Sequence, residues 1–257
     1  MDGLSGGVKF PDAAFCRIGA WAAVILLCYS LLTMVILVAL GVAPEDAQAC
    51  FAMIRENVIT ALLRLDILTV VALPVFFGLY VGTYAALRRD CYVLAAASCA
   101  SAAIGVTLVL ANASPMSLLY LSDQYAAATN ELRRAQLLAA GEAVMSTDMW
   151  HGTAAKMGGL LLQIAGVLIS VAMLRTAVFS KLTGYSGLLT HGLDLLHIVI
   201  GFFAPKASVL AMAVAGPIYL LWFPLVARRL LQLAQRHSAV GTEVLPNLEA
   251  KTRPVRQ

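Results

Sequence analysis

Six long apolar stretches, separated by shorter polar segments, constrain the fold of this chain more than any other feature of its sequence. A helix needs about 20 apolar residues to cross the hydrocarbon core of a bilayer, which is about 30 Å thick. Lipid offers no hydrogen bonds, so a spanning backbone has to satisfy its own polar groups. We therefore predict an all-α integral membrane protein with six transmembrane helices, at Ile18 to Leu40, Ala61 to Leu87, Tyr92 to Ala111, Thr153 to Leu174, Thr183 to Phe203 and Ala207 to Ala227.

Composition excludes an ordinary soluble domain. Hydrophobic residues make up 61% of the 257 residues and charged residues only 12%, whereas soluble domains carry about 25% charged residues. The first apolar stretch is longer than the roughly 7 to 15 apolar residues of a secretory signal peptide, so we expect a retained helix. The five cysteines contain no CxxC pair, which favours neither a disulfide framework nor a zinc cluster.

The basic residues predict the orientation of the helices. Lys and Arg near the ends of spanning helices accumulate on the cytoplasmic side. We therefore predict that both termini are cytoplasmic. The basic C-terminal tail is expected to contact anionic lipid rather than nucleic acid. With the N-terminus inside, the cytoplasmic side receives most of the 18 basic residues, namely Lys9, Arg17, Arg88, Arg89, Arg175, Lys181, Arg228, Arg229, Arg236, Lys251, Arg253 and Arg256.

Tryptophan favours the headgroup level of a bilayer, and Trp21, Trp150 and Trp222 fall near the ends of predicted spans. The chain then divides into a single six-helix membrane domain over residues 1–236 and a basic cytoplasmic tail over 237–257. The tail is polar and contains glycine and proline, so we expect it to be disordered. Helices rich in small residues are compatible with an oligomer but do not require one.

Two segments outside the spans have helical patterns. The stretch PEDAQACFAMIREN begins with proline and two acids and places apolar residues on one side, which predicts a short amphipathic helix before the second span. The segment 114–150 between the third and fourth spans has N-cap signals at Ser114 and Ser122 and apolar residues at helical spacing from Tyr125 to Ala139. It is predicted to be a folded, amphipathic helical cap on the outer side.

Three stretches of the chain resemble one bacterial membrane family. They are SLLYLSDQYAAATNELRRAQLLAAGEAVM, GTAAKMGGLLLQIAGVLISVAMLRTAVFSKLTGYSGLL and LRLDILTVVALPVFFGLYVGTYAALRR. This part of the chain, roughly residues 55–230, is similar to the DUF4386-like family of uncharacterised bacterial integral membrane proteins. The resemblance implies a six-helix fold and a bacterial inner membrane, and it carries over no activity and no binding residues.

The stretch THGLDLLHIV places ionisable residues inside the fifth predicted span. His191, Asp194 and His197 stand three residues apart, so they lie within about 120° of one another around a helix. Asp194 is near the centre of the span, where an unpaired carboxylate costs at least several kcal/mol. The stripe must therefore face protein or water, and ionisable residues in spans often mark ligand or ion pathways.

Polar residues of other spans could join this stripe. Asp66 and Arg64 near the outer end of the second span predict an outward-facing vestibule together with Asp194 and His197. Alternatively, Arg64 extends to the lipid headgroups and Asp66 only balances its charge. Gln163 at the centre of the fourth span either bridges helices or lines the same cavity as Asp194.

Two classes of function remain open on the sequence. The first is a membrane protein that binds or translocates a small ligand or ion through a cavity lined by Asp194, His197, His191, Asp66 and Gln163. The second is a structural or accessory membrane protein in which these residues only fix helix packing. A membrane-embedded enzyme using an Asp and His pair is a third class, without a supporting motif. The spacing of the histidines fits neither a metal site nor paired haem ligands, so we expect no metal, no cofactor and no catalytic residues.

Overall fold

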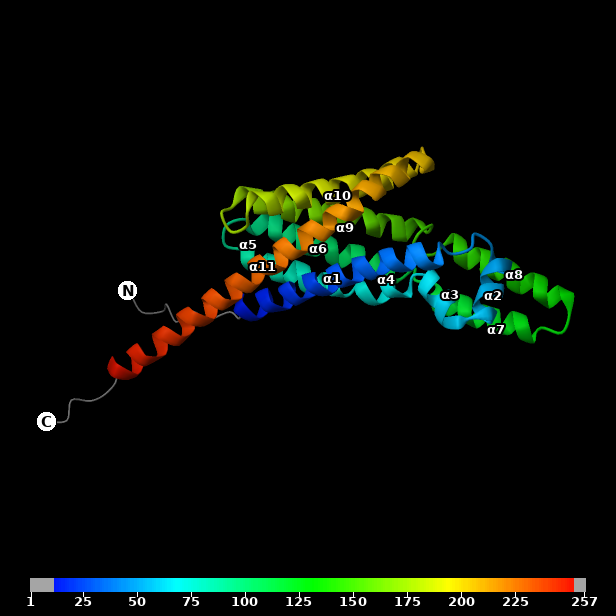
Figure 1. Ribbon diagram of the computed structural model, residues 1–257, viewed down its shortest axis with the longest axis horizontal. Coiled ribbons are helices and arrows are strands. Elements are labelled where there is room, and N and C mark those ends of the chain that lie inside the picture. The colour runs from blue at the N-terminus through cyan, green and yellow to red at the C-terminus, as the bar shows by residue number, and fades with distance from the viewer. Residues whose placement is uncertain (1–11, 252–257) are drawn as a thin grey trace.

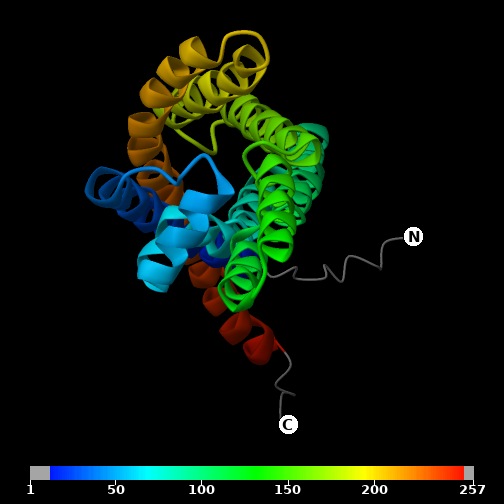
Figure 2. The ribbon, with the colours of Figure 1, turned by 90° about the vertical axis from the view of Figure 1, so that its right-hand side faces the viewer.

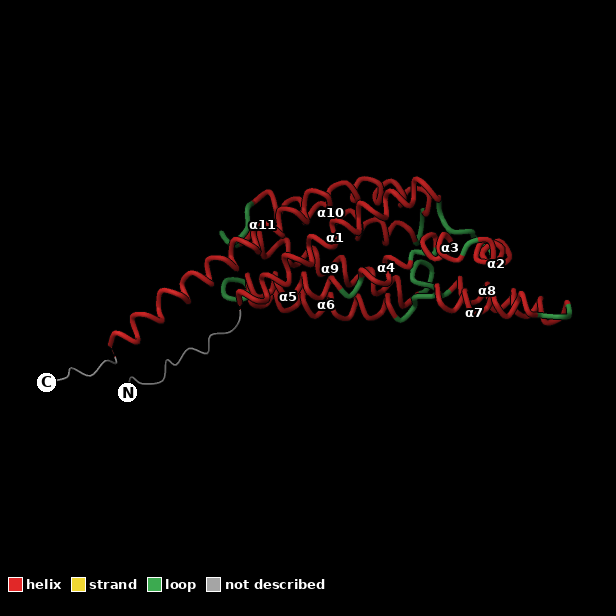
Figure 3. The backbone as a smooth tube through the Cα atoms, turned by 60° about the horizontal axis from the view of Figure 1, so that its bottom comes forward, coloured by secondary structure: helices red, strands yellow, loops and turns green. Residues whose placement is uncertain are grey.

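The computed structural model describes the backbone of residues 12–251 and the side chains of 13–204, 207–208 and 210–236. This part of the chain is helical and contains no strand (Figures 1 and 3). The helices are α1 (Asp12–Leu40), α2 (Ala47–Glu56), α3 (Val58–Arg64), α4 (Ile67–Ala72), α5 (Val75–Leu87), α6 (Tyr92–Leu110), α7 (Pro115–Ala127), α8 (Glu131–Ser146), α9 (Thr153–Arg175), α10 (Lys181–Gly201) and α11 (Pro205–Lys251).

Five helical segments are long and apolar enough to cross a membrane. They are Ala13–Leu40, Ile67–Leu87, Tyr92–Ala127, Thr153–Arg175 and Leu210–Arg236. Each overlaps one of the predicted spans, so the all-helical membrane architecture is supported. The third segment also includes α7, beyond the predicted span. The fifth predicted span corresponds to α10, which is not among these segments. α10 carries the polar stripe, and its polar side chains lower its apolar character.

The long helices form a closed ring. Along this ring α1 packs on α5, α5 on α6, α6 on α9, α9 on α10, α10 on α11 and α11 on α1, as Figure 2 shows in a view along the bundle. The start of α1 and the C-terminal part of α11 lie at one end of the bundle, and α2, α3, α7 and α8 lie at the opposite end (Figure 1). The first and last long helices are therefore neighbours.

Glycines allow two of the helix pairs to approach closely. A Cβ atom at Gly82 of α5 would lie 2.5 Å from the Cα of Gly19 of α1. A Cβ at Gly105 of α6 would lie 2.7 Å from the carbonyl oxygen of Gly158 of α9. Small residues at such crossings are typical of membrane helices, because lipid supplies no hydrophobic force between helices and close packing has to hold them together.

The second predicted span is not one continuous helix. The prediction of a single helix from Ala61 to Leu87 is wrong, because the structure divides this stretch into α3, α4 and α5. Asp66 has a left-handed backbone with φ of 62° and separates α3 from α4. Leu73 and Pro74 separate α4 from α5. Aspartate tolerates the left-handed region better than most residues, because its short polar side chain can bond locally.

The segment predicted as a cap forms the helical hairpin of α7 and α8, and α2 packs against both. Its core contains Phe51 and Ile54 of α2 and Leu118 of α7. The backbone N–H of Ala47 donates to Oε1 of Glu142 at 2.7 Å, which ties the start of α2 to α8. We use the name cap for α2, α7 and α8 together.

Ser122 does not cap a helix, contrary to the sequence prediction. It lies within α7, is buried, and its hydroxyl donates to the carbonyl oxygen of Phe51 at 3.3 Å. The break in the cap falls instead just before α8. There Asn130 is the N-cap and its side chain accepts from the N–H of Arg133 at 2.8 Å. The helical spacing predicted from Tyr125 to Ala139 is therefore interrupted at this point.

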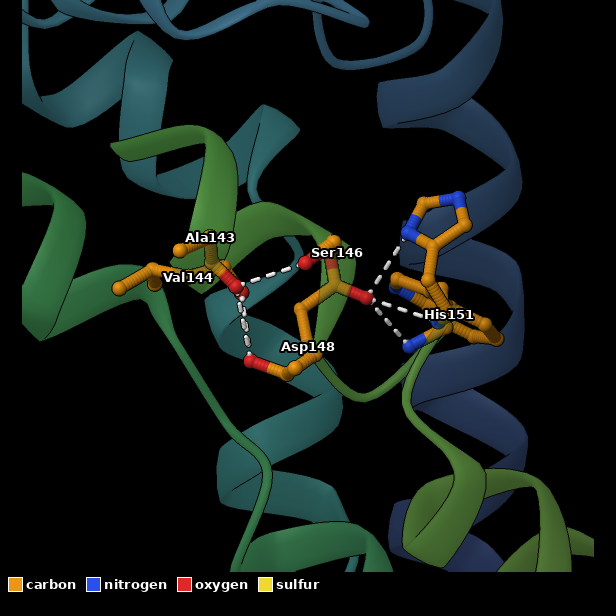
Figure 4. Close-up of polar contacts among 7 residues, drawn as sticks. Ala143, Val144, Ser146, Asp148 and His151 are labelled. Atoms are coloured by element: carbon orange, nitrogen blue, oxygen red, sulfur yellow. Dashed lines mark hydrogen bonds and ion pairs between the residues drawn. The ribbon is translucent and has the colours of Figure 1, made fainter. Parts of the chain in front are cut away.

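A turn organised by Asp148 joins the cap to α9. Oδ1 of Asp148 accepts hydrogen bonds from the backbone N–H groups of Trp150 and His151, both at 2.8 Å. The same oxygen lies 2.9 Å from Nδ1 of His151, and Figure 4 shows the imidazole facing this carboxylate. A Cβ at Gly152 would lie 2.6 Å from the carbonyl oxygen of Thr147, so the chain can enter α9 here only through a glycine.

The last helix is longer than the predicted span from Ala207 to Ala227. α11 runs from Pro205 to Lys251 and leaves the bundle at its C-terminal end (Figure 1). Side chains 237–251 and residues 252–257 lie outside the described part of the chain. The disorder predicted for residues 237–257 therefore stays a prediction.

Candidate functional site

The polar stripe of the sequence lies on an uninterrupted helix. α10 begins after Ser180, whose side chain accepts from the N–H of Thr183, and continues to Gly201. His191, Asp194 and His197 thus keep the helical spacing that places them on one side of the helix. α9 and α11 pack against α10 on either side, so the polar groups that meet the stripe come from these two helices.

Tyr219 of α11 connects three polar residues of the interior. Its hydroxyl donates to Oδ2 of Asp194 at 2.7 Å. The same oxygen lies 3.1 Å from Nδ1 of His191 and 3.2 Å from Oε1 of Gln163. Nδ1 of His191 and Oε1 of Gln163 are 2.8 Å apart. We call Gln163, His191, Asp194 and Tyr219 the Tyr219 cluster. Three of these residues are predicted from the sequence, and Tyr219 is not.

The hydrogen-bonding capacity of these groups gives a consistent arrangement of protons. The amide oxygen of Gln163 can only accept, so Nδ1 of His191 carries the proton that joins them. Nε2 of His191 is then an acceptor. Tyr219 has one proton, which bonds Asp194 when the carboxylate is charged. If Asp194 takes up a proton, it can donate to Tyr219, and Tyr219 can then turn its own proton toward Gln163.

Aromatic rings enclose the buried end of the cluster. The ring of Trp222 stands perpendicular to that of His191, with centroids 4.8 Å apart, and Phe223 stacks on Tyr219 at 5.5 Å. His191 and Trp222 are 1% and 0% exposed. Nevertheless Nε2 of His191 and Nε1 of Trp222 have no hydrogen-bond partner among the described residues. An acceptor and a donor thus lie buried on neighbouring rings, each without a partner.

The burial of Trp222 corrects one sequence prediction. Trp21 and Trp150 are 62% and 56% exposed, as expected for side chains at a headgroup level. Trp222 is instead a core residue of the bundle. The position of Trp222 along the sequence predicts that it lies near the end of a span. It does not predict whether its side chain faces the lipid or the other helices.

Asp194 is only partly buried, as are Gln163 and Tyr219, whereas His191 is buried. Tyr219 holds Oδ2 of its carboxylate, and Oδ1 has no hydrogen-bond partner in the described part of the chain. His197, one turn further along α10, is also partly buried. Its Nδ1 donates to the carbonyl oxygen of Ser208 at 2.9 Å, so His197 joins α10 to α11 and does not bond the Tyr219 cluster.

Asp66 belongs to a different polar group. Thr69 donates its hydroxyl proton to Oδ1 of Asp66 at 2.6 Å, and the hydroxyl of Tyr29 bonds the same threonine oxygen. This group links α1 to α4. Within the described residues, no hydrogen bond joins Asp66 to α10.

Arg64 does not join a vestibule either. Nε and Nη2 of its guanidinium both donate to the carbonyl oxygen of Val42, the former at 3.1 Å. Arg64 therefore holds the link between α1 and α2. The structure brings together Gln163, His191 and Asp194 of the predicted residues, and it places His197 and Asp66 in separate contacts.

No group of three or more His, Cys, Asp or Glu side chains that could hold a metal ion occurs in the described part of the chain. Comparison with protein-family models, with curated proteins and with solved structures gave no match for this chain. Function therefore has to be argued from the geometry of the site itself.

Proposed function

We propose that this chain is a six-span inner-membrane protein that binds or translocates a small ligand or an ion at the Tyr219 cluster. The five apolar helical segments are compatible with a multi-pass membrane protein. The proposal adds α10 as the remaining span, because its 21 residues are long enough to cross a bilayer. α10 also lies between α9 and α11, two helices that are apolar enough to span.

Both termini are cytoplasmic in this proposal. Its support is the positive charge at the end of the bundle where α1 begins and α11 leaves, since Arg17, Arg175, Lys181 and Arg228 all belong to segments at that end (Figure 1). The cap then faces the outside. The bacterial inner membrane and membership of the DUF4386-like family are part of the same proposal, and they rest on the resemblance of the sequence alone.

The carboxyl group of Asp194 carries the proposal of a binding site. One of its oxygens is held by Tyr219 at 2.7 Å, and the other has no partner among the described residues. A residue that only clamps two helices needs no accessible polar atom, whereas Oδ1 of Asp194 is unpaired and is not among the buried unpaired atoms of the described residues. A carboxylate with one oxygen bonded to Tyr219 and the other unpaired favours a ligand-binding role for Asp194.

The chemistry of the cluster favours a ligand that carries hydrogen-bond donors or positive charge. Asp194 offers an anionic oxygen, and Nε2 of His191 is an acceptor when Nδ1 bonds Gln163. A proton or a small cationic or amine-bearing molecule fits this set. For a proton, the chain from Asp194 through Tyr219 to Gln163 and His191 supplies consecutive hydrogen bonds.

The alternative is a structural or accessory protein in which the cluster only fixes helix packing. The hydrogen bonds that join Gln163, His191 and Tyr219 favour this alternative, because polar pairs between membrane helices stabilise a bundle by about 0.6 to 2 kcal/mol. The two functions differ in the expected behaviour of an Asp194→Asn variant. This variant keeps the shape of the side chain and removes its charge.

The test is mass spectrometry and elemental analysis of the protein purified in mild detergent. The matched control is Asp123→Asn, at an exposed position of α7 in the cap. We expect a stoichiometric small molecule or ion in the wild-type protein and in Asp123→Asn, and its loss from Asp194→Asn without a large fall in melting temperature. A wild-type protein with nothing bound, together with an Asp194→Asn variant that only melts earlier, would establish the structural alternative.

A further inference from the structure

A partly polar pocket lies at the opposite end of the bundle from the cap, where the chain turns from α9 into α10. It has a volume of about 360 Å³. Its polar lining comes from the start of α10 and from α11 and consists of Ser180, Thr183, Arg228, Arg229 and Gln232. We call this cavity the Arg228 pocket. It shares no residue with the Tyr219 cluster, and the inference drawn from it is independent of the proposed function.

The two arginines of the pocket have different roles. Arg229 is anchored, because its Nε donates to the carbonyl oxygen of Val178 and its Nη1 lies 3.4 Å from Oε1 of Gln232. Arg228 is exposed and makes no hydrogen bond or ion pair within the described part of the chain. One guanidinium is thus held in place at the wall of the pocket, while the other is available at its rim.

The start of α10 adds neutral donors to the pocket. The hydroxyls of Ser180 and Thr183 are 2.8 Å apart, and the oxygen of Ser180 accepts from the N–H of Thr183 at 3.1 Å. Only one hydroxyl proton is needed for the bond between the two oxygens, so the other remains available to a ligand. The N-terminal end of the α10 dipole also favours an anion here.

The lining of the Arg228 pocket contains no acidic residue. Between Asp148 and Glu243 the sequence contains a single acid, Asp194, and that residue is bonded to Tyr219 in the interior of the bundle. Arg175 and Lys181 flank the turn between α9 and α10 and add to the positive charge. A pocket with two guanidiniums and a free hydroxyl proton, and with no Asp or Glu among its lining residues, matches the acceptor oxygens of a phosphate.

We propose that the Arg228 pocket binds the headgroup phosphate of an anionic phospholipid. The pocket lies where the apolar part of α11 ends, since Arg228 directly follows the apolar run that ends at Ala227. Its remaining lining is mainly apolar and includes Val178, Phe179 and Leu225. Polar donors beside apolar side chains suit the boundary between a phosphate and the glycerol of a lipid, whereas a free phosphate would gain nothing from the apolar part. Basic pockets between spanning helices are typical sites for anionic headgroups.

The experiment is native mass spectrometry of the full chain in detergent, titrated separately with phosphatidylglycerol, phosphatidylcholine and inorganic phosphate. The variant is Arg228→Gln. The matched control is Arg236→Gln, which removes an exposed arginine two turns further along α11 and outside the pocket. We expect the wild-type protein and Arg236→Gln to bind phosphatidylglycerol in preference to phosphatidylcholine. Arg228→Gln should weaken this binding about tenfold, as expected for the loss of a charge-assisted contact.

Arg228→Lys supplies a second measurement, because lysine keeps the charge and loses the paired donors of the guanidinium. Its affinity for phosphatidylglycerol should fall between those of the wild-type protein and Arg228→Gln. Equal binding of the two lipids, or equal losses in Arg228→Gln and Arg236→Gln, would overturn the proposal. Inorganic phosphate that binds saturably and depends on Arg228, without a preference between the lipids, would overturn the assignment to a lipid in favour of a free phosphate.

Discussion

The imidazole of His191 lies directly against the backbone of Gly166, so that a Cβ atom at position 166 would come within 2.1 Å of Cγ of the ring. This contact between α9 and α10 leaves His191 fully buried beside Gln163 and Tyr219. The geometry of the Tyr219 cluster therefore depends on a residue that has no side chain and forms no hydrogen bond with it.

Gly166→Ala is expected to destabilise the protein, because the new methyl group has to displace the imidazole. Overpacking of this kind costs about 1 to 3 kcal/mol. The matched control is Gly192→Ala on α10, where a Cβ would meet nothing within 4 Å, and where alanine should stabilise the helix by up to about 1 kcal/mol. Melting temperatures in detergent check both. Equal melting temperatures of the two variants would contradict the contact described above.

Tyr219→Phe removes the hydroxyl that joins Asp194, His191 and Gln163 and leaves the ring in place. We expect a loss of about 0.6 to 2 kcal/mol in the free energy of unfolding. The same substitution at Tyr185, an exposed residue of α10, should have almost no effect. The measurement is denaturant unfolding in detergent. A Tyr219→Phe variant as stable as Tyr185→Phe would show that the Tyr219 hydroxyl does not contribute to the free energy of unfolding.

Asp66 combines a left-handed backbone with a hydrogen bond from Thr69, and substitutions separate these two properties. Asp66→Asn keeps both an acceptor and a residue type that tolerates φ of 62°. Asp66→Ala loses both and is expected to destabilise the protein by about 1 to 2 kcal/mol more than Asp66→Asn. Asp66→Gly, which relieves the backbone and loses the acceptor, should lie between the two. Thermal unfolding of the three variants gives this order, and an alanine variant as stable as asparagine would argue against it.

The thiol of Cys50 in the cap gives a pH dependence. Burial, together with the nearby carboxylates of Asp46 and Glu142, raises the pKa of this thiol from about 9.0 to about 11. Between these values the unfolded chain loses the proton and the folded chain keeps it, so the folded state binds more protons and its stability falls as the pH rises. Melting temperatures of the wild-type protein should therefore decline between about pH 9 and pH 11. Cys50→Ala should decline less over the same range, and parallel curves would contradict a raised pKa.

The proposed orientation predicts opposite compartments for the cap and the C-terminus. A reporter that is active only in the cytoplasm should be active after Gln257 and inactive in the loop between α7 and α8. A reporter that is active only outside the inner membrane should give the reverse result at the same two positions. Equal activity of one reporter at both positions would require an even number of crossings between the cap and the C-terminus, and would contradict the three spans α9, α10 and α11.

Much of this architecture is visible in the sequence, because hydrophobic length alone marks a spanning helix. The polar stripe on α10 can also be predicted from the sequence, because the spacing of residues along a helix decides which of them share a side. The interruption at Asp66 is not visible, because one left-handed residue inside an apolar run changes neither its length nor its composition. Asn130 could have been recognised, since an asparagine before Glu131 is an N-cap signal.

The partners of the stripe could not be predicted, because they depend on which helices become neighbours. Tyr219 lies 25 residues after Asp194, on a helix whose rotation the sequence leaves open. The expectation that Asp66 and Arg64 meet α10 assumed that the second span lies beside the fifth. In the ring, α4 packs against α1 and α5. The sequence therefore predicts which ionisable residues lie inside the spans, but it does not predict which of them contact one another.

The closed ring also has a consequence for biosynthesis. α1 leaves the ribosome before the other long helices described here and α11 leaves after them, yet the two pack directly against each other. Until α11 is inserted, the side of α1 that α11 covers lacks this neighbour. Asp194 of α10 likewise lacks its hydrogen bond from Tyr219. The insertion of α11 thus closes the ring and completes the Tyr219 cluster in the same step.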